Sequence, residues 1–222
     1  MNRVFNIWIL IITVLTFPFA IAVGKNLDFS LFGVSIQGEE FIYKELVFSI
    51  SAGLIFLLGA IRSSRKWLGM RVVQQVKRFK FSTPVSEQRK KRVLLYNSIE
   101  IIFYLVFAAG LIYFSMSALF VALVFIILAL DSLINTILGV KGKRYRLGLT
   151  KKAVVMADRE TKAIYFNGLK KISKHQQTLY FEYVNGLVLH FPTNLLPDEE
   201  WSDFASSLKE QVSPEKVYYT GF

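Results

Sequence analysis

Four polar residues of this 222-residue chain lie inside long apolar blocks, where uncompensated polar side chains are costly. Glu100 and Asp131 are carboxylates, and Asn97 and Asn135 each lie about one helical turn from one of them. Ionisable groups within a membrane mark functional sites by default. The four residues therefore form a candidate intramembrane polar cluster, and one hypothesis is a small transporter or membrane enzyme that moves a proton or a cation across it.

A structural interpretation competes with transport. Glu100 and Asp131 lie about 10 Å from the cytoplasmic ends of their predicted helices, at 1.5 Å per residue. From this depth they could reach the interface and pair with one of three nearby arginines: Arg62, Arg89 or Arg92. Carriers are typically built from broken helices or internal repeats, and neither is evident here. We favour the structural interpretation.

The remaining residue types offer little for catalysis. The chain has no cysteine, and His175 and His190 are its only histidines. No serine or aspartate is placed to form a recognisable triad with them. The glycine-rich phosphate-binding motifs and the H-E-x-x-H pair are missing from the sequence. We therefore predict no catalytic residue, no metal site and no cofactor, and expect that the protein is not an enzyme.

Long apolar blocks must position these residues. The chain is 53% hydrophobic and only 19% charged. Four blocks have about the 20 residues that a helix needs to cross a bilayer: Val4 to Val23, Ile42 to Ile61, Val93 to Phe114 and Ala118 to Leu138. The last two are joined by three residues and predict a helical hairpin. The first resembles a cleavable signal peptide ending at Ala20-Ile21-Ala22, but its length favours a retained helix.

The charged residues predict the orientation of these helices. The net charge is +11, and eleven Lys and Arg lie between Arg62 and Arg92, opposed only by Glu87. The preceding loop, Gly24 to Phe41, has one lysine against three acids. Because cytoplasmic loops are rich in Lys and Arg, both termini are expected in the cytoplasm. The positive charge is then a signature of membrane topology, and we predict no nucleic-acid partner. The boundaries are 1–61 for the first two helices, 62–92 for a basic loop, 93–140 for the helical hairpin and 141–222 for a cytosolic domain.

The basic loop has the pattern of an amphipathic helix. Between Ser63 and Phe81, Leu68, Val72, Val76 and Phe79 recur at helical spacing. Cations surround them, and they are candidates for binding anionic lipid or an acidic partner: Arg65, Lys66, Arg71, Lys77, Arg78 and Lys80. The alternative is a loop that only sets the topology and whose helix packs on the cytosolic domain. We favour the second interpretation.

From Lys141 onward the pattern changes to short strands of alternating residues. Strands are expected near 145–149, 153–157, 163–166, 169–172, 178–184 and 187–191. The last two flank Asn185-Gly186, a strong hairpin signal. Trp201, Phe204, Leu208 and Val212 then follow at the spacing of a helix that covers a sheet.

Residues 141–212, an antiparallel meander closed by one C-terminal helix, resemble the pleckstrin-homology-like (PH-like) superfold, and in particular bacterial PH-like domains of the YcxB-like type. The fold class expected is a four-helix membrane protein with a small α+β or all-β PH-like domain. The resemblance implies a bacterial inner membrane and a role as an interaction or regulatory module. It also implies that anionic headgroups would bind near the first strand connections, where the chain has Arg144, Arg146, Lys151 and Lys152.

Two kinds of partner follow from these patterns. One is the lipid bilayer with anionic headgroups on its cytoplasmic side, which makes an anionic-lipid-binding scaffold a further alternative. The other is a second membrane protein or a second copy of the chain. Small residues spaced for close helix packing, Ser49 with Gly53 and Ala118 with Ala122, could serve such contacts within the bundle or between protomers.

Overall fold

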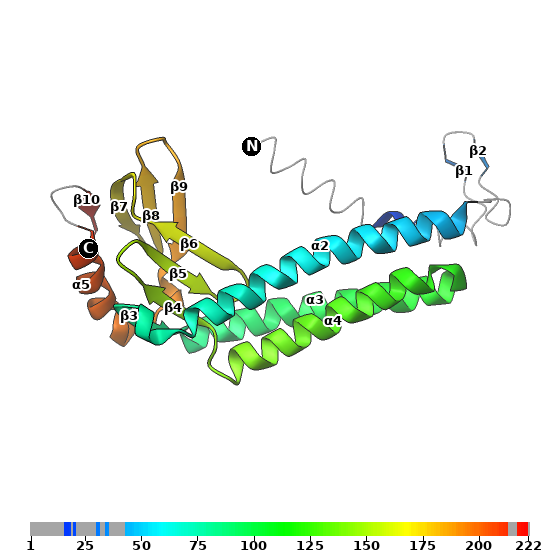
Figure 1. Ribbon diagram of the computed structural model, residues 1–222, viewed down its shortest axis with the longest axis horizontal. Coiled ribbons are helices and arrows are strands. Elements are labelled where there is room, and N and C mark those ends of the chain that lie inside the picture. The colour runs from blue at the N-terminus through cyan, green and yellow to red at the C-terminus, as the bar shows by residue number, and fades with distance from the viewer. Residues whose placement is uncertain are drawn as a thin grey trace. The chain divides into compact units, whose positions relative to one another are not determined.

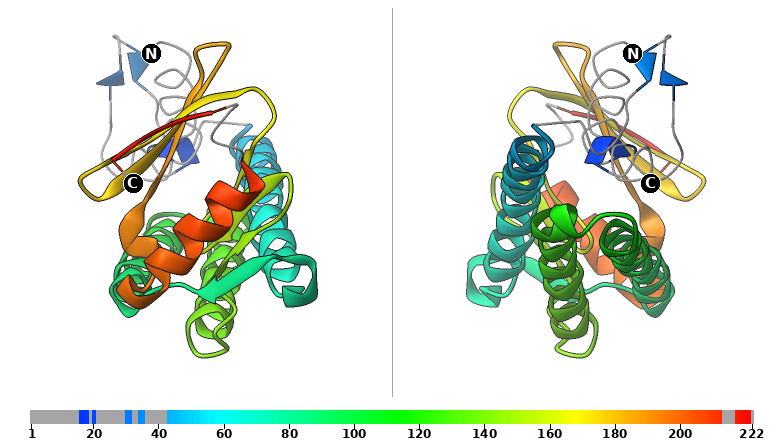
Figure 2. Two further views of the ribbon diagram at one scale, coloured as in Figure 1. Left: turned by 90° about the vertical axis from the view of Figure 1, so that its left-hand side faces the viewer. Right: turned by 90° about the vertical axis from the view of Figure 1, so that its right-hand side faces the viewer.

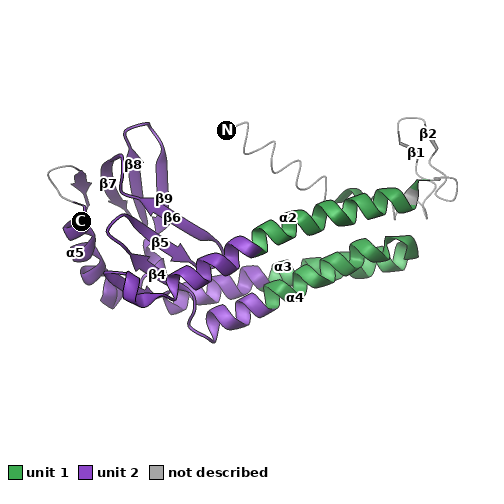
Figure 3. Ribbon diagram, in the orientation of Figure 1, with its two compact units in different colours: residues 1–63, 98–133 green, residues 64–97, 134–222 purple. Residues whose placement is uncertain are grey.

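The computed structural model describes residues 16–18, 20, 30–31, 34–35, 43–212 and 217–221 (Figure 1). The predicted first helix, Val4 to Val23, and the cleavage site that is its alternative lie outside the described residues, apart from 16–18 and 20. The chain forms two compact units (Figure 3). Unit 1 comprises 1–63 and 98–133, and unit 2 comprises 64–97 and 134–222.

Within the described residues, three helices are long and apolar enough to cross a membrane. They are α2 (Lys44–Val73), α3 (Glu87–Phe114) and α4 (Leu119–Val140). A short 3-10 turn, η2 (Met116–Ala118), joins α3 to α4. These helices confirm three of the predicted spans and the tight helical hairpin. The strands β1 (Ser30–Leu31) and β2 (Val34–Ser35) form a short antiparallel pair ahead of α2.

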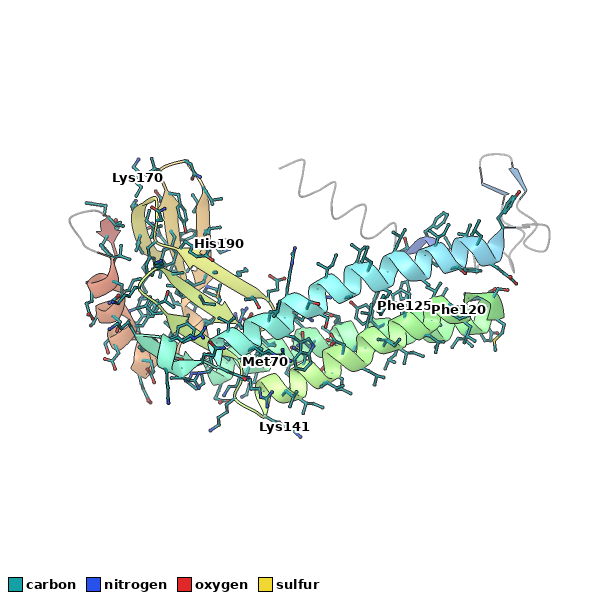
Figure 4. All side chains as sticks on the ribbon, viewed as in Figure 1. Met70, Phe120, Phe125, Lys141, Lys170 and His190 are labelled. Carbon is teal, nitrogen blue, oxygen red and sulfur yellow. The ribbon has the colours of Figure 1, made fainter. Side chains whose placement is uncertain are left out.

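The helical part of unit 1 has a narrow core and a wide apolar surface. Phe48, Ile55 and Phe125 are almost fully buried. A Cβ on Gly59 would lie 2.3 Å from Leu128 Cδ2, so α2 and α4 approach closely there. In contrast, Leu57, Ile102 and Phe120 (labelled with Phe125 in Figure 4) are 56%, 60% and 66% exposed. Exposed apolar area of this extent requires an apolar surrounding, which indicates a multi-pass membrane protein.

Unit 2 contains two four-stranded sheets. Their orders are β3-β4-β5-β6 and β10-β7-β8-β9, and all pairs are antiparallel except β10 with β7. The strands are β3 (Phe81–Pro84), β4 (Arg146–Leu149), β5 (Ala153–Ala157), β6 (Thr161–Tyr165), β7 (Leu169–His175), β8 (Thr178–Tyr183), β9 (Val188–Pro192) and β10 (Tyr218–Thr220). The predicted strands of the C-terminal region are therefore present.

The helix α5 (Trp201–Gln211) joins the two sheets through one core. It is the orange-red helix at the front of the left view in Figure 2. The Phe204 ring contacts Phe81 of β3 and Phe191 of β9, with centroid distances of 5.7 and 5.8 Å. Phe204 and Leu208 are fully buried, as the predicted apolar stripe requires. Met70 of α2 and Val93 of α3 belong to the same core, so the helix ends in unit 2 fold together with the strands.

The predicted hairpin at Asn185-Gly186 is confirmed. β8 and β9 pair in antiparallel register, with Tyr180 opposite His190. Gly186 has a φ of +79°, a backbone conformation that side chains with a Cβ rarely adopt. Its N–H donates to the Tyr183 carbonyl at 3.0 Å. Figure 1 shows this hairpin reaching beyond the neighbouring strands.

The segment expected to be a basic loop with its own amphipathic helix is divided differently. α2 continues to Val73, because no proline interrupts the run of residues that tolerate a helix. The 3-10 turn η1 (Val76–Arg78) follows, and the chain then forms β3. β3 pairs with β4 with Thr83 opposite Leu147. β3 therefore completes the first sheet, although all strands of this domain were predicted to follow residue 141.

The face of α2 that packs on the strands also differs from the expected one. Met70 and Val73 are buried, and a Cβ on Gly69 would lie within 3 Å of three Thr161 side-chain atoms. Leu68 and Val72 of the predicted apolar stripe are instead 60% and 46% exposed. Glycine allows the closest approach of β6 to the helix, so the helix presents its Gly69 side to the sheet.

Candidate functional site

The predicted intramembrane cluster is split between the two units. Glu100 and Asp131 belong to unit 1, whereas Asn97 and Asn135 belong to unit 2. Asp131 is half-buried on α4. The four residues therefore form two separate groups, one in each unit.

In unit 1, Glu100 forms an ion pair with Arg62, one of the three arginines that the sequence offers. Arg62 Nη2 lies 2.7 Å from Glu100 Oε2, and Nη1 donates to Oε1 at 2.8 Å. Nη1 also donates to the Tyr104 hydroxyl oxygen at 3.1 Å. The Glu100 side chain is only 10% exposed. A two-point arginine pair holds the carboxylate in one orientation, which suits a structural role better than proton transfer.

In unit 2, Asn97 and Asn135 join α3 and α4 to the first strands. Asn97 Nδ2 donates to Thr136 Oγ1 at 2.7 Å. The Tyr145 hydroxyl donates to Asn135 Oδ1 at 3.0 Å, and burial raises the pKa of this phenol to about 12. A Cβ on Gly139 would lie 2.0 Å from Tyr145 Cζ, so the ring rests directly on α4. This buried group fixes the strands on the helix ends.

A second polar joint lies at the turn between β5 and β6. Arg89 of α3 donates through Nε to Asp158 Oδ2 at 2.7 Å, and its Nη2 is 2.6 Å from the same oxygen. Asp158 Oδ1 accepts the Glu160 N–H at 3.1 Å. The Thr161 hydroxyl donates to the Arg65 carbonyl oxygen of α2 at 3.1 Å. We call these contacts the β5–β6 clamp, because one turn holds both helices.

The predicted basic residues lie on three elements. Arg65, Arg71, Lys77, Arg78 and Lys80 are exposed at the end of α2 and in the chain that follows, but Lys66 is buried, with 7% of its surface exposed. Arg144 is exposed just before β4, and Arg146 donates to Ser82 of β3. Lys151 and Lys152 are exposed in the β4–β5 turn.

Two of these groups meet at one end of the first sheet. The Lys80 N–H donates to the Leu149 carbonyl at 2.8 Å, which places Lys80 beside the turn that carries Lys151 and Lys152. The pairing of β3 with β4 brings together segments about 70 residues apart in the sequence, a contact that no local pattern predicts.

A polar cavity of about 830 Å³ lies within unit 2 between the start of α3 and the start of α5. Lys90 is buried in its wall and its Nζ donates to Glu87 Oε1 at 2.6 Å. The Lys174 ammonium lies 4.2 Å from the centre of the Trp201 ring. Four acids face these cations: Glu87, Asp198, Glu199 and Glu200. The mixed charges are largely neutralised within the wall, so the cavity favours no ligand of one charge sign. Apart from the acids that precede α5, no sequence pattern indicated this cavity.

An apolar surface on the strands was not predicted. Val184 and Leu187, in the turn of the β8–β9 hairpin, are 76% and 49% exposed, and Val188 at the start of β9 is 49% exposed. Tyr165 of β6 is 61% exposed, and its carbonyl accepts the Tyr183 hydroxyl at 2.6 Å. We call Tyr165, Val184, Leu187 and Val188 the hairpin patch. A turn of this kind is usually polar, so exposed aliphatic residues there require an explanation.

The two histidines do not form a site together. Tyr180 lies between them, with ring centroids 6.4 Å from His175 and 6.0 Å from His190. Both histidines are exposed. Within the part of the chain that the structure describes, no three His, Asp or Glu side chains gather in a group that could hold a metal ion.

Comparison with protein-family models, with curated proteins and with solved structures gives no match to this chain. Its function is therefore inferred from these sites alone.

Proposed function

We propose that the protein is a multi-pass inner-membrane protein whose strand domain binds a partner protein at the cytoplasmic face of the membrane. Both termini would be cytoplasmic, as the distribution of Lys and Arg indicates. The observation that carries the proposal is the hairpin patch. Its apolar side chains are exposed, whereas Leu179, Phe181 and Phe191 of β8 and β9 are fully buried in the core of the domain.

The architecture of the domain supports an adaptor role. Two four-stranded sheets share one core with a C-terminal helix, which is the arrangement expected of a PH-like domain. We infer that β3 supplies the first strand of this domain and that the α3–α4 hairpin is inserted after it. PH-like folds serve many functions, so the site must identify the ligand.

The connection to the helices supports the same role. The Tyr145–Asn135 hydrogen bond and the β5–β6 clamp join the strands to three helix ends within unit 2. A module joined in this way to the ends of membrane helices is confined to the membrane. Such an arrangement favours partners that are themselves confined to the membrane, because both proteins then meet in two dimensions.

The hairpin patch has the properties of a protein-binding surface. β9 is an edge strand in its sheet, so its outer backbone groups can pair with an added strand. Val188 begins this edge and Val184 and Leu187 lie in the turn before it, while Tyr165 is linked to β8 through the Tyr183 hydroxyl. Aromatic and apolar residues are typical of the centre of an interface. We infer that an extended segment of the partner pairs with β9 and covers the patch.

The Arg62–Glu100 pair is the reason to prefer this role over transport. A transported cation or proton would have to displace a two-point arginine contact. The proposal therefore assigns Glu100 to the stability of the helix bundle.

Photo-crosslinking in cells tests the proposal. A photoreactive phenylalanine derivative in place of Val184 is expected to yield one discrete crosslinked product with a membrane protein. The same residue in place of Ser206, which is exposed on α5, is the matched control. The Leu187→Asp change should abolish the product from position 184 without changing the amount of protein. Equal products from both positions, or a product that persists after Leu187→Asp, would contradict the proposal.

A further inference from the structure

We propose that the outer face of the α2 end docks on the anionic phospholipid headgroups of the membrane leaflet beside it. This face consists of Leu68, Arg71 and Val72 at the end of α2, together with Val76, Lys77 and Arg78 of the η1 turn that follows it. The proposal is independent of the hairpin patch, which lies on other elements of unit 2.

The geometry separates two faces on the same helical turns. Leu68 and Val72 lie four residues apart on one side of α2, and Val76 follows in η1; they are 60%, 46% and 46% exposed. The other side of these turns is occupied, because Met70 and Val73 are buried and Gly69 lies against Thr161 of β6. The apolar stripe therefore does not contribute to the core of the domain, and aliphatic residues on an exposed helical face need another apolar or interfacial surrounding.

The charges around the stripe are of one sign. Arg71, Lys77 and Arg78 are exposed, and no acid occurs in the sequence between Glu45 and Glu87. Apolar residues beside lysine and arginine are typical of helices that lie in the headgroup region, where the stems pack on the acyl boundary and the cations meet phosphate. Each such cation strengthens binding to an anionic surface by about fivefold.

The continuity of α2 identifies lipid, and not an acidic protein, as the occupant. The helix runs without interruption from Lys44 to Val73, and its apolar part is one of the three membrane spans. The outer face begins only six residues after Arg62, so the covalent chain holds it beside the headgroups. The bilayer is thus the anionic surface present at the highest local concentration.

Contacts on both faces of the same turns give the docking a consequence. When lipid holds Leu68 and Val72, the Gly69 side of the helix holds β6 through Thr161. Docking would therefore restrain the strand domain relative to the leaflet, and a loss of anionic lipid would release it.

A spin label at position 76 tests the proposal, since the chain has no cysteine and Val76→Cys provides a single attachment site. The full chain is placed in nanodiscs of phosphatidylcholine, with or without phosphatidylglycerol. In phosphatidylglycerol we expect the label to be shielded from a water-soluble relaxation agent and accessible to oxygen. It should become exposed again as salt is raised, because screening weakens charge attraction. Equal accessibility in the two lipids, or shielding that salt does not change, would overturn the proposal.

Two variants separate this face from a general effect of charge. Replacing Arg71, Lys77 and Arg78 by Gln should lower the docking equilibrium by about 100-fold. The control replaces two exposed lysines on other elements, Lys162 of β6 and Lys170 of β7 (labelled in Figure 4), by Gln and should leave docking nearly unchanged. An equal loss in the control would overturn the proposal. So would a label that is shielded in native membranes but not in phosphatidylglycerol nanodiscs, because that outcome identifies a protein as the occupant.

Discussion

The Arg89–Asp158 ion pair predicts how firmly the strand domain is held on α3. Asp158 is 5% exposed and Arg89 is 24% exposed, so the pair is shielded from water but not fully buried. Breaking a fully buried pair by removing one partner costs about 3–5 kcal/mol. Because the arginine keeps some contact with solvent, we expect Asp158→Asn to cost about 2 kcal/mol. The asparagine retains an oxygen that can accept the Glu160 N–H, so the variant removes mainly the charge.

Hydrogen–deuterium exchange measures this change where it occurs. If β5 and β6 open locally, a loss of about 2 kcal/mol accelerates exchange of their amides by about 30-fold. Arg89→Gln should give a similar acceleration, and the double variant should add little to either single one, because both remove the same interaction. Asp203→Asn on the exposed side of α5 is the control and should change nothing. Independent, additive effects of the two single variants would refute the reasoning.

Three further predictions concern individual buried contacts in the two units. Gly69→Leu should destabilise unit 2 by about 2 kcal/mol or more, because the leucine Cβ would overlap Thr161 and leave no room for the side chain. Adding Thr161→Gly to this variant should restore part of the lost stability in a thermal unfolding experiment. Burial raises the pKa of Tyr145 and of Tyr219 to about 12, above the usual value near 10, so both phenols contribute their full stability below pH 10 and lose it as the pH rises towards 12. Tyrosinate absorbance should show two phenols that ionise only near pH 12. Ionisation of all tyrosines near pH 10 would contradict this prediction. Arg62→Leu alone should destabilise the helix bundle more than the double variant Arg62→Leu with Glu100→Leu, because the single variant leaves a buried carboxylate without its arginine. Thermal unfolding in detergent measures this difference. A single variant that is more stable than the double variant would argue against a structural role for Glu100.

The sequence predicted the elements that are determined locally. Apolar blocks of sufficient length identified α2, α3 and α4, and the Asn185-Gly186 pair located the β8–β9 hairpin. The α5 stripe also predicted its buried face, with Phe204 and Leu208. In each case the signal and the structure lie within one short stretch of chain, so that spacing alone was sufficient.

What the sequence did not predict depends on contacts between distant segments. β3 is four residues long and forms a strand because it pairs with β4, from which the α3–α4 hairpin separates it in the sequence. Gly53 was chosen as a close-packing residue, but a Cβ there would meet no described residue within 4 Å, whereas described side chains approach α2 at Gly59 and Gly69. Leu68 and Val72 lie on one side of a helix as their spacing predicted, but the helix ends at Val73 before Val76, and periodicity cannot identify what an apolar face contacts.

The candidate sites were predicted in the same uneven way. An arginine partner for Glu100 was expected because a carboxylate at this shallow depth can reach the interface, and Arg62 provides it. The role of Tyr145 was not predicted, because its position in an alternating strand indicated only a buried ring. Its hydroxyl donates to Asn135 of α4, a contact that the alternation does not reveal. The hairpin patch was also missed, since single apolar residues in a turn become notable only when their exposure is known.

The location of the strand domain is the claim on which both proposals depend, and cysteine accessibility in whole cells measures it directly. Ser206→Cys, on the exposed side of α5, introduces the only thiol of the chain. If the domain is cytoplasmic, a membrane-impermeant maleimide should label this position only after the cells are permeabilised. Ser35→Cys, in the loop expected outside, should react in intact cells. Labelling of position 206 in intact cells would contradict the cytoplasmic assignment and with it the proposed partner and lipid sites.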